Sequence, residues 1–206
     1  MNDDNTPPSK RTGRPRAFDR DQALNIALDL FWRHGFEGTS TAQLTAAMGI
    51  APPSLYAAFG SKEALFREAL AAYGERYSGF LNDAMSAPGP TRAAVEQMLL
   101  RAARQFTNAE HPLGCMVAAG ELQASPASAA LVGEVTGQRQ AARQAIRSRL
   151  EAARKAGELP ADTDTATLSA FFAMTIQGMA VQARDGASPA MLKRLAELAM
   201  QAWPQG

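Results

Sequence analysis

The apolar residues of this 206-residue chain recur at helical spacing along almost its whole length. No stretch shows the sustained apolar–polar alternation, rich in Val, Ile and Thr, that is typical of a half-buried strand. Apolar residues make up 46% of the chain, so it can bury a sizeable core. The sequence therefore predicts an all-α fold of about nine helices.

Capping residues and glycines mark the first two predicted helices. Asp19, with Gln22 three residues later, favours a helix start, and Gly35 ends that helix. Ser40 repeats the capping pattern, and a short second helix ends at Gly49. Two helix starts with a side-chain acceptor at the cap position are therefore expected within the first fifty residues.

The third and fourth helices are bounded by proline, glycine and serine. Pro52 and Pro53 suit the first turn of a helix, where the missing N–H groups would be unpaired anyway, and Gly60 closes that helix. Ser61 caps a longer fourth helix, which we expect over about 61–85 and which would join the N-terminal part to the rest. Beyond it, the positions of glycine, proline and capping residues predict helices at 91–108, 114–125, 127–156, 164–184 and 189–203.

The net charge of +1 excludes a uniformly basic surface, but one local patch is basic. Lys10, Arg11, Arg14 and Arg16 lie within seven positions of a Pro-containing stretch without helical periodicity. We therefore expect residues 1–17 to be a flexible basic arm, residues 18–62 a compact helical unit, and residues 63–206 a larger helical domain.

Two short helices joined by a turn that contains Gly49 form the pattern of a helix-turn-helix, in which the second helix enters the major groove of DNA. Such a helix must present short side chains near its start. Leu55 and Phe59, four residues apart, are expected to face inward. The residues expected to approach base edges and thymine methyls are Pro52, Pro53, Ser54 and Ala57.

Three segments of this region, Gly35–Ser40, Leu44–Ile50 and Ser54–Leu65, resemble the signature of the tetracycline-repressor (TetR) family. The resemblance covers about residues 14–70 and combines the turn glycines, a Leu-Tyr pair and a Lys after the capping Ser. It implies a homodimeric transcriptional regulator, most simply a repressor that leaves a palindromic operator when a small-molecule inducer binds. In this family the last two helices pair with their copies as a four-helix bundle.

Carried over by position, the resemblance implies that Thr41, Tyr56 and Lys62 contact DNA phosphates, and that Arg14 and Arg16 enter the minor groove. Three blander interpretations stay open: Tyr56 as an aromatic at the core edge, Lys62 as an ordinary surface lysine, and the arm as a solubilising tail. The family often has a hydroxyl residue in place of Ala51 and a polar one in place of Pro52. Base recognition is therefore expected to depend on Ser54, the arm and DNA shape.

The last two predicted helices have apolar faces broader than one surface helix needs, which indicates a dimer interface. The alternative is that both helices only complete the core of one chain. The residues expected at the interface are Phe172, Ile176, Met179, Leu192, Leu195 and Leu198. The residues expected to line an inducer pocket, with ordinary core packing as the alternative, are Met98, Phe106, Met116, Phe171, Met174 and Gln177.

The single cysteine, Cys115, is expected at or near a helix N-terminus, where it could act as a redox or electrophile sensor or be an inert buried thiol. A metal site that uses His111 and Cys115 has little support, and we expect no metal and no cofactor.

The sequence also disfavours an enzyme, because it has only two histidines, no paired nucleophile and no phosphate-binding loop. No secretory signal or membrane span is evident, which predicts a cytoplasmic protein. A non-specific DNA-coating protein is the remaining alternative.

Overall fold

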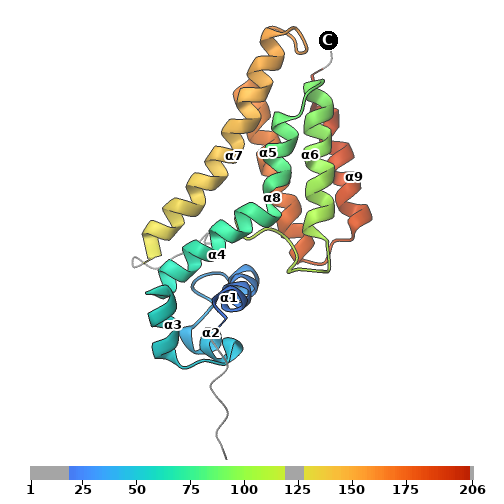
Figure 1. Ribbon diagram of the computed structural model, residues 1–206. Helices are drawn as coiled ribbons and strands as arrows, with labels where there is room; N and C mark the ends of the chain where they lie inside the picture. Colours follow the sequence, from blue (N-terminus) through green and yellow to red (C-terminus); the bar gives the residue numbers. More distant parts are fainter. Residues whose placement is uncertain (1–18, 119–127, 205–206) are drawn as a thin grey trace, which may run out of the picture.

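The computed structural model describes residues 19–118 and 128–204, and these residues form nine α-helices and one short 3-10 helix, without strands (Figure 1). The all-α prediction is confirmed. The elements are α1 (Arg20–His34), α2 (Thr41–Met48), α3 (Pro52–Phe59), α4 (Lys62–Tyr77), α5 (Gly79–Ser86), α6 (Thr91–Phe106), α7 (Ala129–Lys155), α8 (Thr165–Arg184), α9 (Pro189–Ala199) and η2 (Met200–Ala202).

The predicted helix starts in the N-terminal part are confirmed. The Asp19 carboxylate accepts a hydrogen bond from the N–H of Gln22 at 3.0 Å. At Ser40 the full reciprocal pair forms, because the Ser40 hydroxyl accepts from the N–H of Gln43 and the Gln43 side chain accepts from the N–H of Ser40. These side chains satisfy backbone donors that a helix start leaves unpaired.

We call α1, α2, α3 and the first half of α4 the head, and α5 to α9 the body. The head has an aromatic core, in which Phe31 meets Phe66 edge to face with 5.1 Å between ring centroids. Leu55 and Phe59 of α3 are buried against it, as the four-residue spacing predicts. Burying these two side chains fixes which side of α3 faces solvent.

A single helix over 61–85 was expected, but the structure divides it at Ser78 into α4 and α5. The Ser78 hydroxyl donates a hydrogen bond to the carbonyl of Gly74 at 3.1 Å, and Ser78 has φ −109° and ψ 2°. A serine that bonds back to the carbonyl four residues earlier competes with the helical ladder and bends the chain. As a result, α4 carries the chain out of the head and α5 starts in a new direction in the body (Figure 1).

The helix expected over 114–125 does not begin where the sequence suggests. Residues 114–118 form turns, and Gly114 has a φ of +80°, which no helical residue adopts. Residues 119–127 lie outside the described part of the chain. In the body, α6 packs against α5, α8 and α9, and α7 packs along α8. Within the described ranges, no helix has the length and apolar character needed to cross a membrane.

Candidate DNA-binding surface and effector cavity

The exposed side of α3 carries all the residues that the sequence assigned to base contacts. Pro52, Pro53, Ser54 and Ala57 are exposed, and Tyr56 keeps 47% of its surface accessible. The side chain of Ala51 caps nothing, and neither proline has an N–H. The start of α3 therefore offers short, nearly featureless side chains to a groove and few backbone donors to a phosphate.

The two helix starts that flank α3 place the other predicted phosphate contacts. Thr41 is the first residue of α2 and is half-buried. Lys62 is the first residue of α4, and its ammonium lies 4.0 Å from the centroid of the Phe36 ring. A cation over an aromatic face is attracted by the ring quadrupole, so Phe36 helps to fix the position of the Lys62 ammonium. Arg14 and Arg16 lie outside the described residues.

The connection from α1 to α2 depends on two glycines of the signature. Gly35 ends α1 with a φ of +72°, a conformation that favours glycine. At Gly38 the constraint is space, because a Cβ atom there would lie 2.2 Å from the carbonyl oxygen of His34. The backbone of the turn before α2 thus packs directly on the backbone at the end of α1. This contact fixes the orientation of α2 and α3 relative to α1.

Arg20, which sequence reasoning did not single out, ties three helices of the head together. Its guanidinium bonds both carboxylate oxygens of Glu68 at 2.8 Å and lies 4.6 Å from the centroid of the Phe59 ring. Both bonds come from the single nitrogen Nη2, so the contact is a charge-assisted pair at a partly exposed site rather than a two-nitrogen fork. The pair joins residues 48 positions apart, so no local pattern signals it.

The body contains a cavity of about 280 Å³, walled by α5, α6, α7, α8 and the turn at 115–118. Two of the six residues predicted for a pocket, Phe106 and Gln177, line it. Met98 and Met116 are buried elsewhere in the core, Phe171 is half-buried away from the cavity, and Met174 is 61% exposed. The other lining residues are Ser78, Phe80, Leu81, Asn82, Cys115, Val117, Ala118, Gln138, Arg139, Ala141, Ala142, Ile146, Ala173 and Ile176.

Most of this cavity wall is aliphatic or aromatic, with a few polar side chains. Arg139 is its one cationic residue among those described, and its guanidinium donates to the carbonyl of Val117 and to the hydroxyl of Thr136, both at 2.9 Å. Gln138, Gln177 and Asn82 add amide groups. The cavity therefore suits a small, mostly apolar molecule with one or two hydrogen-bonding groups.

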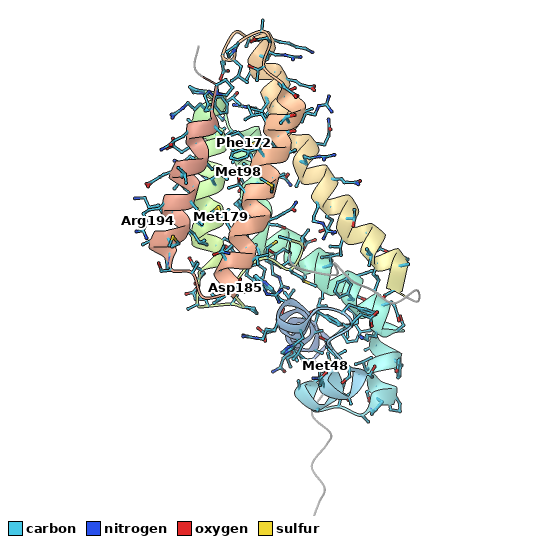
Figure 2. The ribbon with its side chains drawn as sticks, turned by 180° about the vertical axis from the view of Figure 1, so that it is seen from behind. Met48, Met98, Phe172, Met179, Asp185 and Arg194 are labelled. Atoms are coloured by element: carbon cyan, nitrogen blue, oxygen red, sulfur yellow. The ribbon has the colours of Figure 1, made fainter. Side chains whose placement is uncertain are left out.

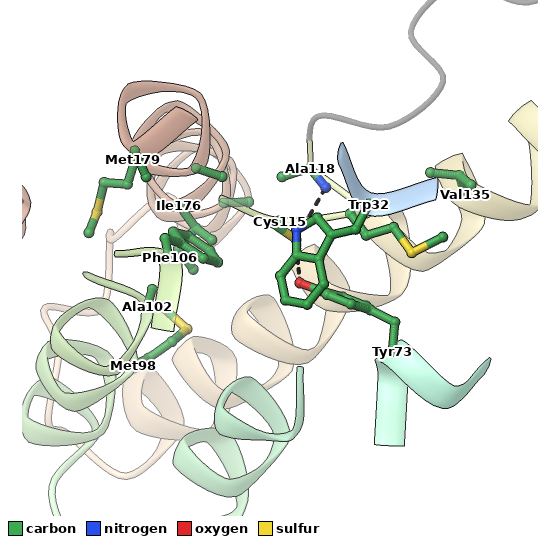
Figure 3. Close-up of a cluster of buried hydrophobic side chains, with 14 of the residues drawn as sticks. Trp32, Tyr73, Met98, Ala102, Phe106, Cys115, Ala118, Val135, Ile176 and Met179 are labelled. Carbon is green, nitrogen blue, oxygen red and sulfur yellow. Dashed lines mark hydrogen bonds between the residues drawn. The ribbon is translucent and has the colours of Figure 1, made fainter. Parts of the chain in front are cut away.

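Cys115 lines the cavity from one of the turns and is buried (Figure 3). Its sulfur accepts hydrogen bonds from the hydroxyl of Tyr73 at 3.1 Å and from the N–H of Ala118 at 3.3 Å. Burial raises the pKa of the Cys115 thiol, and the two hydrogen bonds only partly oppose this. Among the described residues, no three His, Cys, Asp or Glu side chains gather as a metal-binding set.

We expect the free energy of unfolding to fall as the pH rises above about 9. Burial raises the pKa values of Cys115 and Tyr73 in the folded chain, so the unfolded chain loses these protons first and is favoured at alkaline pH. Each group contributes a slope of up to about 1.4 kcal/mol per pH unit between its unfolded and folded pKa values. Urea unfolding at pH 7, 9 and 10.5 measures it, and Tyr73→Phe should make the fall shallower. Equal slopes for the two proteins would contradict this assignment.

Most side chains predicted for the dimer interface are already covered within one chain. Phe172, Ile176, Met179 and Leu192 are buried in the core of the body, and Figure 2 shows Phe172 and Met179 in the bundle. Leu195 is half-buried, and Leu198 is 58% exposed. The apolar side chains that α8 and α9 leave exposed are Met174, Val181, Met191 and Leu198. We call these four the α8–α9 apolar face.

A helix-turn-helix head joined by one helix to a helical body that contains a cavity defines a one-component DNA-binding regulator. Comparison of the chain with known protein families supports this class. Residues 23–69 match the model of bacterial regulatory proteins of the tetR family, and residues 92–199 match the tetracyclin repressor-like C-terminal domain. The chain belongs to the TetR family.

Full-length relatives support this membership. The transcriptional repressor ComR of Escherichia coli is 34% identical over 197 residues, which is 95% of this chain and 94% of ComR. Among solved structures, a cysteine-substituted variant of the TetR family regulator CifR, complexed with 26 bp double-strand operator DNA, is 43% identical. It superposes with a TM-score of 0.86 over 93% of this chain and 100% of the solved CifR chain. A putative TetR regulator from Rhodococcus sp. RHA1 is 39% identical, with a TM-score of 0.61 over 90% of this chain and 99% of its own.

Proposed function

We propose that the protein is a homodimeric transcriptional repressor that binds an inverted-repeat operator and releases it when a small molecule fills the cavity. The observation that carries the proposal is the exposed side of α3, whose buried side is fixed by Leu55 and Phe59. The relatives ComR and BdcR are named repressors, and the CifR structure contains operator DNA. The role is regulatory rather than enzymatic, and the protein acts in the cytoplasm, where it meets the chromosome.

The α8–α9 apolar face supports the homodimer. Met174 and Val181 lie seven residues apart and therefore on the same side of α8, and α9, which packs against α8, exposes Met191 and Leu198, also seven residues apart. An operator with two half-sites about 34 Å apart needs two recognition helices, and a twofold dimer supplies them. The cavity supports release by a small, mostly apolar inducer.

Selection of DNA fragments by the purified protein tests the function directly. We expect the bound fragments to share an inverted repeat, and we expect binding to resist excess random DNA. A protein that coats DNA without sequence preference would give no common motif and would lose the fragments to random competitor. Failure to enrich any sequence would overturn the proposal of an operator-binding repressor.

Within this proposal, Tyr56 and Lys62 contact phosphates of each half-site. Lys62→Met keeps the apolar stem on Phe36 but removes the charge. We expect operator affinity to fall about tenfold and the salt slope to decrease by about two, since each dimer loses two phosphate contacts. Tyr56→Phe removes only the hydroxyl and should weaken binding at every salt concentration. Anisotropy titrations at several salt concentrations measure both effects.

The matched control is Lys155→Met. Lys155 is an exposed lysine at the end of α7 that lies farthest from the head (Figure 1). It should leave both the affinity and the salt slope unchanged. If Lys62→Met binds the operator with the slope of the Lys155→Met control, Lys62 does not contact a phosphate.

A further inference from the structure

Arg184, in the last turn of α8, joins the body to the head through the backbone of α1. Its guanidinium donates hydrogen bonds to the carbonyl oxygens of Trp32 at 2.8 Å and of Arg33 at 2.9 Å. Both carbonyls belong to the final turn of α1, where no further turn supplies donors. A cation at this position also meets the negative end of the helix dipole.

Gly114 packs closely against the aliphatic stem of the same arginine. A Cβ atom at Gly114 would lie 2.6 Å from the carbonyl oxygen of Ala180 and 2.7 Å from Cγ of Arg184. The Gly114 N–H donates to the carbonyl of Phe106 at 2.8 Å, which anchors the turn to the end of α6. Only a residue without a side chain allows the turn to lie this close to α8.

Both elements that hold Arg184 also form walls of the cavity. Cys115, next in sequence to Gly114, lines it, and so do Ile176 and Gln177, two turns before Arg184 on the same helix. Figure 2 labels Asp185, the following residue, where the end of α8 meets the head. A displacement of the cavity wall, either at Cys115 or at Gln177, therefore occurs close to Arg184: Cys115 follows Gly114, and Gln177 lies two helical turns before Arg184.

We propose that Arg184 is the positioning residue that couples the cavity to the DNA-binding head. With the cavity empty, Gly114 presses the stem of Arg184 into place and the guanidinium holds the end of α1. Because α1 leads through Gly35 and Gly38 directly into α2 and α3, this contact sets the orientation of the recognition helix. A ligand that displaces the 114–118 turn releases the contact and shifts the population to heads that no longer match the operator. The proposal rests on the proposed function.

The first test compares Arg184→Met, which keeps the length of the stem, with Arg92→Met at an exposed position at the far end of α6. We expect operator affinity to fall about tenfold in Arg184→Met and not in Arg92→Met. Without DNA, the amide of Gly35, which donates to Phe31 at 2.8 Å, should exchange about tenfold faster in Arg184→Met. Arg184→Lys keeps the charge and should recover part of both effects.

The exchange measurement separates two failures. If wild-type protein selects no operator, the proposed function fails, while the exchange rate at Gly35 still reports whether Arg184 holds the head. If wild-type protein binds its operator but Arg184→Met has wild-type affinity and wild-type exchange at Gly35, the proposal for Arg184 is overturned.

The second test mimics a filled cavity without a ligand. Gly114→Ala must displace both the Arg184 stem and the Ala180 carbonyl of the same helix, and Ala142→Phe, a half-buried position on α7, fills the cavity from the opposite element. We expect each to lower operator affinity about tenfold in the wild-type background and less than about threefold in the Arg184→Met background. Because Gly114 has a positive φ, Gly114→Ala can fail to fold, and Ala142→Phe then decides alone. Equal losses in the two backgrounds would overturn the coupling role.

Discussion

Replacing Gly38 by alanine is expected to destabilise the head by about 3 kcal/mol and to remove operator binding. The added Cβ would lie 2.2 Å from the carbonyl oxygen of His34, and the atom it meets belongs to the backbone. A flexible side chain could move away cheaply, but here the end of α1 must shift. That shift changes the start of α2 and therefore the placement of α3. Urea unfolding measures the loss of stability, and anisotropy with the selected operator measures the loss of binding.

Gly74→Ala is the matched control for this glycine. Gly74 lies inside α4, and the nearest neighbour of an added Cβ is the Ser78 hydroxyl oxygen at 3.9 Å, an ordinary contact. Alanine is favoured over glycine inside a helix, so this variant should gain about 0.5–1 kcal/mol of stability. If Gly38→Ala unfolds at the same urea concentration as wild type, the turn before α2 tolerates a side chain and does not fix the head.

The second large effect is expected from Met174→Glu, which should dissociate the homodimer. Met174 is 61% exposed in one chain and lies on the α8–α9 apolar face. In a twofold interface the substitution occurs twice, so two carboxylates would be buried without partners. The dissociation constant of the dimer should rise about a thousandfold or more. Sedimentation equilibrium measures it, and operator binding should weaken with it because one recognition helix reads only one half-site.

Gln97→Glu controls for the added charge. Gln97 is exposed on α6, outside the α8–α9 apolar face, and the substitution also replaces a neutral side chain with a carboxylate. It should leave the oligomeric state unchanged. A Met174→Glu variant that sediments as the wild-type dimer would move the interface to a different surface of the body.

Helix boundaries in the head could be predicted because the signals for them are local. A cap and its acceptor lie three residues apart, and proline or glycine acts at its own position, so Ser40, Pro52 and Gly60 suffice. The break at Ser78 was not predicted, although serine bonding to the carbonyl of Gly74 is also local. Apolar residues continue through it at helical spacing, and periodicity alone cannot distinguish one helix from two.

The two sides of α8 illustrate what periodicity could not assign. This helix is apolar around much of its circumference, so the sequence indicates two buried sides without showing which one meets the core. Phe172, predicted for the partner, is fully buried within one chain, and Met174, predicted for the pocket, faces outward. The phase of the helix is set by packing against α6 and α7, which depends on tertiary structure.

Contacts between distant segments could not be predicted from the sequence. Arg20 and Glu68 are 48 residues apart, and Arg184 is 152 residues from Trp32. Each arginine looks like an ordinary surface charge in its own segment. The cavity is equally non-local, because its wall combines α5 to α8 with a turn that sequence analysis interpreted as helix.

The acceptors that Arg184 uses on α1 are main-chain carbonyls, which every amino acid provides. The Arg184 contact is therefore independent of the head's side chains, unlike the Arg67–Glu134 ion pair and the stacking of Trp32 on His111. Substitutions on the exposed side of α3 can change the DNA sequence that is recognised without disturbing this link. A head from a related regulator, joined together with its α4 at the Ser78 break, should therefore keep the Arg184 contact on this body, but it needs a cation in place of Arg67 and an aromatic ring in place of Trp32 to keep the other contacts.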